Sequence, residues 1–409
     1  MLHDMKIRSI EVLPCYPKSN YVKITTESGL VGWGEPVVEG RARATAQAVE
    51  EVAPQLIGKN AGDIEDNFNI LYRGNFYKGG AVLNSAISGI EQALWDIKGK
   101  HFGVPVYDLL GGAAKAKQKV YAWIHGSTPE AMADSAQRRL AQGYKNIKMN
   151  VTNEMEWISG HERIEAASAL LGAVRDRVGD KLEIGVDFHG RVHKTVARQL
   201  MREIEQYNIL FVEEPVLPYN EEDLLDLRRS SSIPIATGER LYTRWDFKKI
   251  FRLGAVDIIQ PDLSHAGGLW EVRKISAMAE AYDIAVAPHC PLGVIAFAAC
   301  LHHDLATPNA FIQEQVIDVH TTADGGALGQ QPGGSSSGGG NRPPAAVEMY
   351  LKENTGVFTF EDGFVLKPQS PGLGIEVNEE KLHEDAKRTD MPTWSHPVWR
   401  MDDGTVTEW

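Results

Sequence analysis

The C-terminal two thirds of the chain alternate short apolar runs with longer segments of helical periodicity. The first two apolar runs are KVYAWIHG and YKNIKMN, and six more follow at nearly regular intervals, EIGVD, LFVEE, IPIATGE, VDIIQPD, IAVAPH and AFIQE. Strands that alternate with helices of roughly 10 to 15 residues are typical of a parallel sheet. Eight such strands predict an α/β fold in which the sheet closes into a barrel.

The first 115 residues show a different pattern. Apolar and polar residues alternate in KIRSIEVLP and NYVKITTESGLVGWGE, which predicts a small antiparallel sheet. Apolar residues at three-and-four spacing in GRARATAQAVEEVAPQLIG and LNSAISGIEQALWDIKGKHFG predict amphipathic helices that end at glycine. We therefore expect an α+β domain over residues 1–115.

We expect the barrel to occupy residues 116–350 and a C-terminal segment to occupy residues 351–409. Within the barrel region, a Gly/Ser-rich segment at about 321–345 lacks the Gly-Lys-Ser/Thr ending of a phosphate-binding loop. Its composition cannot bury much apolar area, so a flexible surface loop is the expected structure.

Composition excludes several classes of protein. The chain has 409 residues, is 43% hydrophobic and carries a formal net charge of -13, which argues against a nucleic-acid partner. No apolar run approaches the ~20 residues that span a bilayer, and the N-terminus lacks a signal pattern, so we expect no membrane partner and a cytoplasmic location. The three cysteines show no metal-site or disulfide spacing and are expected to be free thiols in a reducing compartment.

A polar residue stands at the end of each of the six later strands, at steps of 23 to 27 residues. Because the C-terminal ends of barrel strands converge on one mouth, these side chains are expected to build a common site. The six residues are Asp187, Glu213, Glu239, Asp262, His289 and Glu314.

Asp187, Glu213 and Glu239 end three consecutive strands, so three carboxylates are expected to meet at the barrel mouth. Like charges at close range in a partly desolvated site need a counter-charge. An all-oxygen ligand set without His or Cys favours a hard ion, and Mg²⁺ is the predicted cofactor. The alternative is that each carboxylate pairs with a Lys or Arg of the helical shell.

Two histidines are candidates for acid and base. Asp262 and His289 come from neighbouring strand ends, and a carboxylate beside an imidazole fixes its tautomer and raises its basicity. His189 lies two residues beyond Asp187, so strand alternation is expected to turn both side chains to the same side. The alternatives are a satisfied structural histidine for His289 and a solvent-exposed loop histidine for His189.

The strand-end motifs resemble those of a known family. VDFHGRVHK, FVEEPVLP, TGERLYTRWDFKKI, IIQPDLSHAGG, VAPHCPLG and IQEQ are similar to motifs of the enolase superfamily, in its mandelate racemase-like branch. GWGEPVVEGRA and FYKGGAVLNSAISGIEQALWDIKGK resemble the N-terminal domain of that branch. The resemblance implies an α+β capping domain on a modified TIM-type (β/α)7β barrel, with the C-terminal segment returning to the cap.

The resemblance also implies roles for the strand-end residues. The base that removes a proton falls on His289, with Asp262 tuning it, and the acid that protonates a leaving hydroxyl falls on His189. Glu314 matches a glutamate that helps to stabilise the enolate, which we hypothesise requires a protonated carboxyl. The implied reaction removes the C2 proton and C3 hydroxyl of a sugar acid, with D-galactonate expected, and gives a 2-keto-3-deoxy acid. The three family metal ligands fall on Asp187, Glu213 and Glu239.

Several alternatives stay open at this point. A racemase or epimerase of the same superfamily would use a Lys-x-Lys pair on the second strand, where the chain has Lys148 and Asn150. An amide cannot act as the second base, which favours dehydration. Another aldonate, such as gluconate or mannonate, and a catalytically silent sugar-acid-binding barrel are the other possibilities. The candidate substrate contacts are Lys148, Asn150, Arg240 and His125.

The family is commonly oligomeric, so a homo-oligomer is the expected assembly. The aromatic C-terminal tail contains Trp394, Trp399 and Trp409. These side chains are expected to bury apolar area either under the cap or at an interface between subunits.

Overall fold

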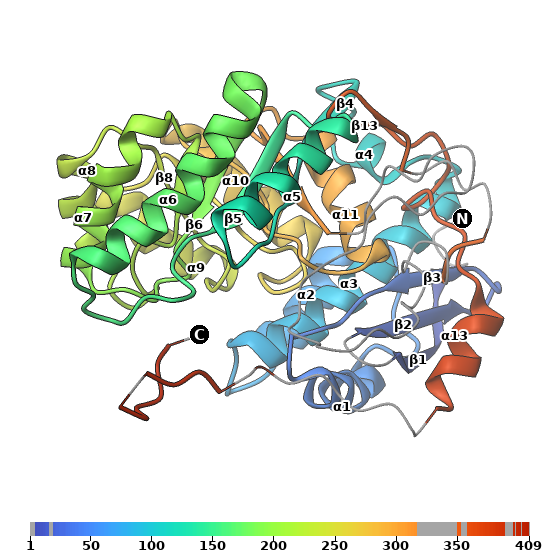
Figure 1. Ribbon diagram of the computed structural model, residues 1–409. Helices are drawn as coiled ribbons and strands as arrows, with labels where there is room; N and C mark the ends of the chain where they lie inside the picture. Colours follow the sequence, from blue (N-terminus) through green and yellow to red (C-terminus); the bar gives the residue numbers. More distant parts are fainter. Residues whose placement is uncertain are drawn as a thin grey trace.

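The protein consists of a barrel and a smaller domain that covers one end of it (Figure 1). The structure is a computed structural model that describes residues 5–15, 19–316, 350–352, 358–388, 396, 398–401 and 403–408. The Gly/Ser-rich segment expected at 321–345, together with Trp394 and Trp409, lies outside these residues. No helix in the described part of the chain is long and apolar enough to cross a membrane.

The small domain begins with a three-stranded antiparallel sheet, as the alternating pattern predicted. β1 (Ile7–Cys15), β2 (Ser19–Thr26) and β3 (Val31–Gly34) lie side by side in that order. The second strand is the centre of the sheet, and its residues Val22 and Ile24 are fully buried. The helices that follow are α1 (Ala42–Val52), the 3-10 turn η2 (Ala53–Gln55), α2 (Ile64–Arg73), α3 (Ala81–Phe102) and α4 (Val106–Leu109).

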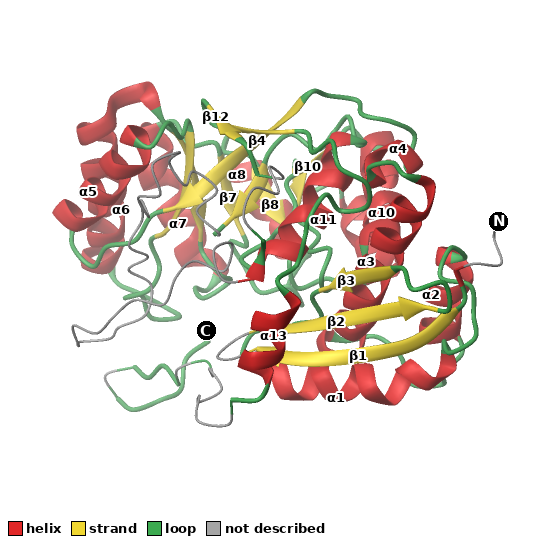
Figure 2. Ribbon diagram, turned by 90° about the vertical axis from the view of Figure 1, so that its right-hand side faces the viewer, coloured by secondary structure: helices red, strands yellow, loops and turns green. Residues whose placement is uncertain are grey.

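Helix α3 lies between the sheet and the barrel, so it is buried over most of its length (Figure 2). It approaches β3 so closely that a Cβ at Gly34 would stand 1.8 Å from the carbonyl oxygen of Gly89. Only glycine allows two backbones to come this near. The close contact of Gly34 with Gly89 therefore fixes the distance between the sheet and α3.

The barrel contains eight parallel strands in sequence order. From β4 to β10 each strand is hydrogen-bonded to the next. A parallel bridge between Val286 and Ala310 and the pairing of β11 with β4 close the ring. The strands are β4 (Lys117–Trp123), β5 (Asn146–Asn150), β6 (Glu183–Asp187), β7 (Phe211–Glu213), β8 (Ile235–Thr237), β9 (Ile258–Ile259), β10 (Ala285–Val286) and β11 (Gln313–Gln315).

A helix follows each of the first seven strands, which gives the predicted (β/α)7β order in the described residues. Local signals start some of these helices, for example the Thr128 side chain, which accepts a hydrogen bond from Ala131 N ahead of Pro129. The main helices are α5 (Pro129–Ala141), α6 (His161–Val178), α7 (Lys194–Ile204), α8 (Asp223–Ser230), α9 (Thr243–Leu253), α10 (Leu269–Ala281) and α11 (Val294–Leu305). Short 3-10 turns follow α6 and α7, namely η3 (Gly179–Lys181) and η4 (Glu205–Tyr207).

Apolar side chains fill the centre of the barrel below the mouth. One buried cluster contains a residue from most strands or from the segment beside them: Tyr121, Phe211, Ala236, Ile258, Ala287 and Ile312. Parallel barrels are packed in this way and leave no pore. The polar strand-end residues therefore stand on an apolar floor.

The C-terminal segment touches both bodies. A hairpin of β12 (Phe360–Glu361) and β13 (Phe364–Leu366) pairs antiparallel with the first half of β4. Helix α13 (Glu379–Ala386) then packs against β1 of the small domain (Figures 1 and 2). The boundaries at 115 and 350 stay predictions.

Two buried glutamates of the small domain hold the barrel. Glu35 accepts hydrogen bonds from the backbone N–H groups of Gly293, Ile295 and Ala296, at the start of α11, at 2.9 to 3.2 Å. Glu91 on α3 accepts from Leu269 N and Trp270 N at the start of α10, and from Trp95 Nε1, at 2.7 to 2.9 Å. Helix N-termini attract carboxylates, so each glutamate serves as a cap for a barrel helix.

Candidate active site

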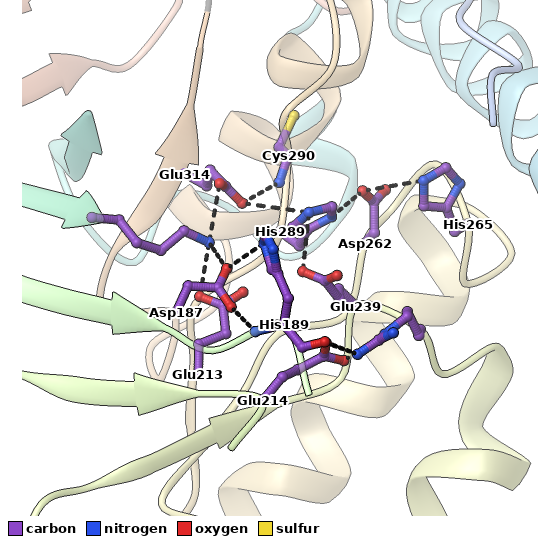
Figure 3. Close-up of polar contacts among 12 residues, drawn as sticks. Asp187, His189, Glu213, Glu214, Glu239, Asp262, His265, His289, Cys290 and Glu314 are labelled. Atoms are coloured by element: carbon purple, nitrogen blue, oxygen red, sulfur yellow. Dashed lines mark hydrogen bonds and ion pairs between the residues drawn. The ribbon is translucent and has the colours of Figure 1, made fainter. Parts of the chain in front are cut away.

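The three carboxylates expected to bind a metal meet at the barrel mouth (Figure 3). Asp187 and Glu213 are the last residues of β6 and β7, and Glu239 lies two residues beyond β8. One oxygen from each carboxylate lies within 4.8 Å of the others. Asp187 and Glu213 are fully buried, whereas the Glu239 side chain is 14% exposed. The cluster therefore opens toward solvent on the Glu239 side.

Lys148 on β5 supplies a positive charge inside this cluster. Its Nζ lies 2.7 Å from Glu213, 3.1 Å from Glu314 and 3.7 Å from Asp187, and the side chain is fully buried. The indole ring of Trp123 lies 4.6 Å from the same nitrogen. The counter-charge thus comes from a barrel strand and not from the helical shell.

The pKa values of the carboxylates show that one lysine does not balance them. Burial and the nearby charge of Asp187 raise the pKa of Glu213 well above its usual value, although Lys148 acts in the opposite direction. Burial raises the pKa of Asp187, but the charges of His189 and Lys148 lower it by more than burial raises it. The net pKa of Asp187 therefore lies below its usual value. Crowded carboxylates thus shift one another's ionisation.

The donor atoms suit a divalent cation. Glu213 Oε1 is buried and accepts no hydrogen bond from any described residue, whereas Asp187 Oδ2 faces His189 Nε2 at 3.0 Å. An unsatisfied buried carboxylate oxygen is costly unless something else binds it. Three carboxylates whose oxygens lie this close together match the requirements of a hard ion. Among the described residues, this is the one cluster whose acidic groups meet the geometry of a metal site.

His289 is held between two carboxylates. Its Nδ1 lies 2.8 Å from Asp262 Oδ2 and its Nε2 lies 3.2 Å from Glu239 Oε2. Asp262 is itself fixed, because Ser264 N donates to its other oxygen at 2.6 Å. Burial lowers the pKa of His289, but Glu239, Glu314 and Asp262 outweigh burial and raise it well above the usual value. Asp262 therefore orients the ring so that Nε2 faces the metal cluster.

A second histidine stands on the other side of Asp262. His265 Nε2 lies 3.6 Å from Asp262 Oδ2, and its Nδ1 lies 2.8 Å from the hydroxyl of Ser85 on α3. Burial raises the pKa of Asp262, but His265 and His289 lower it, and the net pKa lies below the usual value. Asp262, which contacts His289, is thus linked through His265 to Ser85 of the capping domain.

His189 lies beside Asp187, where the sequence placed it, but by another backbone route. Strand β6 ends at Asp187, and His189 has a positive φ of 52°. Its Nε2 lies 3.0 Å from Asp187 Oδ2. A left-handed turn, and not strand alternation, therefore brings the ring to the cluster. Non-glycine residues with positive φ are uncommon and concentrate at functional sites.

Asn150 fixes the orientation of the His189 ring. Thr152 N donates to Asn150 Oδ1 at 2.8 Å, so the amide nitrogen of Asn150 faces His189 Nδ1 at 3.2 Å. An amide nitrogen donates only, so His189 Nδ1 accepts and its Nε2 carries the hydrogen. The hydrogen of His189 therefore points toward Asp187 and the metal cluster.

Donors surround Glu314 on β11. Its Oε1 accepts from Trp123 Nε1 and lies 3.1 Å from Lys148, while its Oε2 accepts from Cys290 N at 3.0 Å. Both carboxyl oxygens of Glu314 therefore already face donors of the protein. The hypothesis that Glu314 donates a hydrogen bond as a neutral acid stays a prediction, and these contacts oppose it.

The other predicted substrate contacts lie near the cluster but have protein partners. The Arg240 guanidinium binds both oxygens of Glu214 and donates to His189 O at 3.1 Å. His125 stacks on Trp123 with ring centres 5.8 Å apart, and burial and Arg139 lower its pKa. Their contact with substrate stays a prediction.

Sequence reasoning missed Trp123 and Glu214. Trp123 is the last residue of β4, two residues before His125, so the rule that strand ends converge on the barrel mouth could have found it. Glu214 follows Glu213 directly and has a φ of 40°. A doubled glutamate at a strand end gives no sign of which carboxylate enters the site, so nothing in the sequence separates their roles.

The chain matches two parts of one known family. Residues 18–111 match the mandelate racemase / muconate lactonizing enzyme N-terminal domain, and residues 131–381 match the family described as enolase C-terminal domain-like. The protein therefore belongs to the enolase superfamily, in its mandelate racemase-like branch, as the motif resemblance implied.

Within that branch, the chain is similar over its full length to proteins named D-galactonate dehydratase. The D-galactonate dehydratase of Pectobacterium atrosepticum is 44% identical over 405 residues, which cover 99% of this chain and 100% of that protein. The D-galactonate dehydratase of Xanthomonas euvesicatoria is also 44% identical, over 407 residues with the same coverage. The similarity thus spans both domains and the C-terminal segment.

Solved structures share the whole fold. A crystal structure of an enolase from Agrobacterium radiobacter, with bound Na and L-malate, is 30% identical with a TM-score of 0.86 and covers 98% of this chain and 100% of that chain. A mandelate racemase/muconate lactonizing enzyme from a Sulfitobacter species is 30% identical with a TM-score of 0.81 and covers 96% of this chain and 99% of that one. These comparisons confirm the predicted capped barrel.

Proposed function

We propose that this protein is a metal-dependent acid-sugar dehydratase, a hydro-lyase that converts D-galactonate to 2-dehydro-3-deoxy-D-galactonate. The observation that carries the proposal is the convergence of His289 and His189 on one carboxylate cluster from different strands. The full-length similarity to enzymes named D-galactonate dehydratase supports the choice of substrate. The substrate partner is then a small-molecule aldonate.

The cofactor is Mg²⁺, held by Asp187, Glu213 and Glu239. A bound ion would supply positive charge for the substrate carboxylate and for the negative charge that develops on it. The carboxylates that would hold the ion include Glu239, which raises the pKa of His289. Filling the site therefore returns His289 toward the neutral form that a base needs.

His289 acts as the base. Because its Nδ1–H donates to Asp262, its Nε2 is the atom that accepts the C2 proton of the substrate. Asp262 then stabilises the imidazolium, which keeps the ring in one orientation through the step. Lys148, fixed by Glu213 and Glu314, places a further positive charge beside the developing anion.

His189 acts as the acid. It protonates the C3 hydroxyl from its imidazolium form as that group leaves, and the ring returns to the neutral form. Burial lowers the pKa of His189, but the Asp187 carboxylate outweighs burial and raises it, and Nε2 is the nitrogen that faces the cluster. The elimination product is an enol that tautomerises to the 2-keto-3-deoxy acid.

A racemase is less well supported. Asn150 takes the position where the second lysine of a racemase would stand, and its amide cannot abstract a proton. Lys148 is fully buried among carboxylates, which stabilise its charged form and raise its pKa against the effect of burial. A charged lysine is a poor base, so the site favours one-sided proton removal.

The experiment is a semicarbazide assay for 2-keto acids with Mg²⁺ and a set of aldonates that includes galactonate, gluconate and mannonate. We expect product from D-galactonate. His289→Asn should abolish both dehydration and exchange of the C2 proton in D₂O, a loss of at least ~10³-fold. His189→Asn should stop dehydration and retain exchange.

Two outcomes would contradict the proposal. Absence of product from every aldonate would leave a silent sugar-acid-binding barrel as the better reading. Loss of exchange in His189→Asn, with folding and metal binding intact, would show that the roles of the two histidines are wrongly assigned.

A further inference from the structure

The end of the chain forms a short hairpin. Arg400 and Val406 make an antiparallel bridge, and Thr407 N donates to Trp399 O at 3.1 Å. Gly404 makes the turn with a φ of 86°. These hydrogen bonds lie within the hairpin and fix its local fold. The position of the hairpin on the protein depends on its contacts with other segments. We call residues 396–408, where the structure describes them, the C-terminal strap.

The strap reaches from the capping domain to the barrel. At one end, His396 Nε2 donates to the carbonyl of Glu39, five residues beyond β3, at 3.1 Å. At the other end, the hydroxyl of Tyr219, in the segment between β7 and α8, donates to Glu408 at 3.2 Å. Figures 1 and 2 show the last residues on the side of the barrel that faces the cap.

Between these ends, Trp399 covers a buried arginine. The guanidinium carbon of Arg191 lies 4.0 Å from the centre of the Trp399 ring, and Arg191 is only 1% exposed. Its Nη1 donates to Asn153 O at 2.9 Å, whereas its Nε has no acceptor among the described residues. The ring face of Trp399 therefore supplies much of the environment that keeps this cation buried.

Arg191 belongs to the loop that carries His189. Its backbone N–H donates to Phe188 O at 3.1 Å, and Gly190 N donates to Glu214 O at 2.7 Å. His189 thus lies in a tight turn whose last side chain is pinned under the strap. Arg191 follows His189 by two residues in this turn, so a shift of Arg191 is expected to disturb the His189 backbone, whose φ is 52°.

We infer that the C-terminal strap is part of the active site and that Trp399, by stacking on Arg191, positions His189 for protonation of the leaving hydroxyl. This role of Trp399 rests on the proposed function. Trp399 is a positioning residue, since it acts through the loop. The base His289 comes from β10 and makes none of these contacts, so the strap should affect the acid step and spare the base step.

The test compares Trp399→Ala with Trp399→Phe in the full chain with Mg²⁺. Trp399→Ala removes the ring and should lower kcat for dehydration by about 10- to 100-fold, the cost of misplacing a reacting group by about 1 Å. Exchange of the C2 proton in D₂O should stay within about 2-fold, because His289 is untouched. Trp399 Nε1 donates to no described residue, so Trp399→Phe should keep dehydration within roughly 3-fold of wild type.

Trp245→Ala is the matched control. Trp245 on α9 also has an arginine over its ring, with Arg244 at 4.5 Å, and it contacts the cap through Tyr72. Its removal should leave the ratio of dehydration to exchange unchanged. An equal loss of both activities in Trp399→Ala, or the same change of ratio in Trp245→Ala, would overturn the positioning role.

A second measurement does not depend on catalysis. Hydrogen exchange of the backbone amides in residues 188–193 should be faster in Trp399→Ala than in wild type and unchanged in Trp399→Phe. Unchanged protection in Trp399→Ala would overturn the inference even if the enzyme is active. If wild type gives no product but Trp399→Ala loses protection, the docking stands and the proposed function fails.

Discussion

Two groups of buried carboxylates show how differently the same chemical group can be used in one protein. Asp187 and Glu213 at the barrel mouth and Glu35 and Glu91 at the contact with the cap are all at most 3% exposed. Both oxygens of Glu35 and Glu91 accept backbone N–H groups from a helix N-terminus. At the mouth, Glu213 Oε1 accepts no hydrogen bond from the described residues, and Asp187 Oδ2 faces the side chains of His189 and Lys148 and no backbone N–H group.

The difference separates stability from function. A carboxylate that caps a helix has its partners in the same fold, so it fixes how the cap sits on the barrel. Glu213, with one buried oxygen that no described residue satisfies, instead suits the binding of a cation. Glu91 caps α10, the helix that follows the strand of Asp262, and Glu35 caps α11, the helix that follows the strand of His289.

The largest expected effect comes from Glu213→Gln. The amide removes a metal ligand, and turnover of D-galactonate should fall by about 10³-fold or more. The amide keeps the shape of the carboxyl group and removes one of the crowded negative charges, whose proximity, together with burial, raises the pKa of Glu213. The melting temperature of the metal-free variant should therefore equal or exceed that of wild type, measured by calorimetry after chelation.

Mg²⁺ provides the control for this variant. Binding to the folded state alone raises the melting temperature of wild type. The rise should be lost or strongly reduced in Glu213→Gln. A metal-free variant that melts well below wild type would place Glu213 with Glu35 and Glu91 as a structural carboxylate.

The carboxylates at the barrel mouth could be predicted from the sequence, but those that cap helices could not. Strand-end residues of a parallel barrel converge by topology, so Asp187, Glu213 and His289 could be assigned to one site from spacing alone. The period of about 25 residues and the apolar runs made the barrel strands equally visible. Fold class and candidate cluster were therefore accessible before any coordinates.

Contacts between segments far apart in the chain were not accessible. Glu35 and Glu91 look like ordinary polar residues of a strand end and a helix, because their partners lie 258 and 178 residues away. Lys148 was predicted as a substrate contact, and its position on β5 did not indicate that its Nζ would face Asp187, Glu213 and Glu314 together. The docking of Trp399 on Arg191 likewise depends on how the C-terminal hairpin contacts the loop that follows β6.

A smaller effect is expected from Glu91→Gln. The amide cannot accept from Leu269 N, Trp270 N and Trp95 Nε1 together, so at least one buried donor is left unpaired, which costs about 2 to 3 kcal/mol. The free energy of unfolding at pH 5.5, measured with denaturant, should fall by that amount. Turnover per folded molecule should change far less than in Glu213→Gln. If Glu91→Gln loses as much turnover as Glu213→Gln, the distinction between the helix-capping carboxylates and the barrel-mouth carboxylates is wrong.

The pH dependence of this stability loss is the smallest and sharpest test. Burial raises the pKa of Glu91 from 4.5 to about 7, against the hydrogen bonds that lower it. A raised folded-state pKa means that the folded protein holds the proton more tightly, so the contribution to stability is complete below pH 4.5 and is lost as pH rises to 7. Between pH 5.5 and 8, the gap in unfolding free energy between wild type and Glu91→Gln should therefore shrink by roughly 2 kcal/mol. A gap that widens with pH would show that the helix N-terminus outweighs burial and that Glu91 stays ionised in the folded protein.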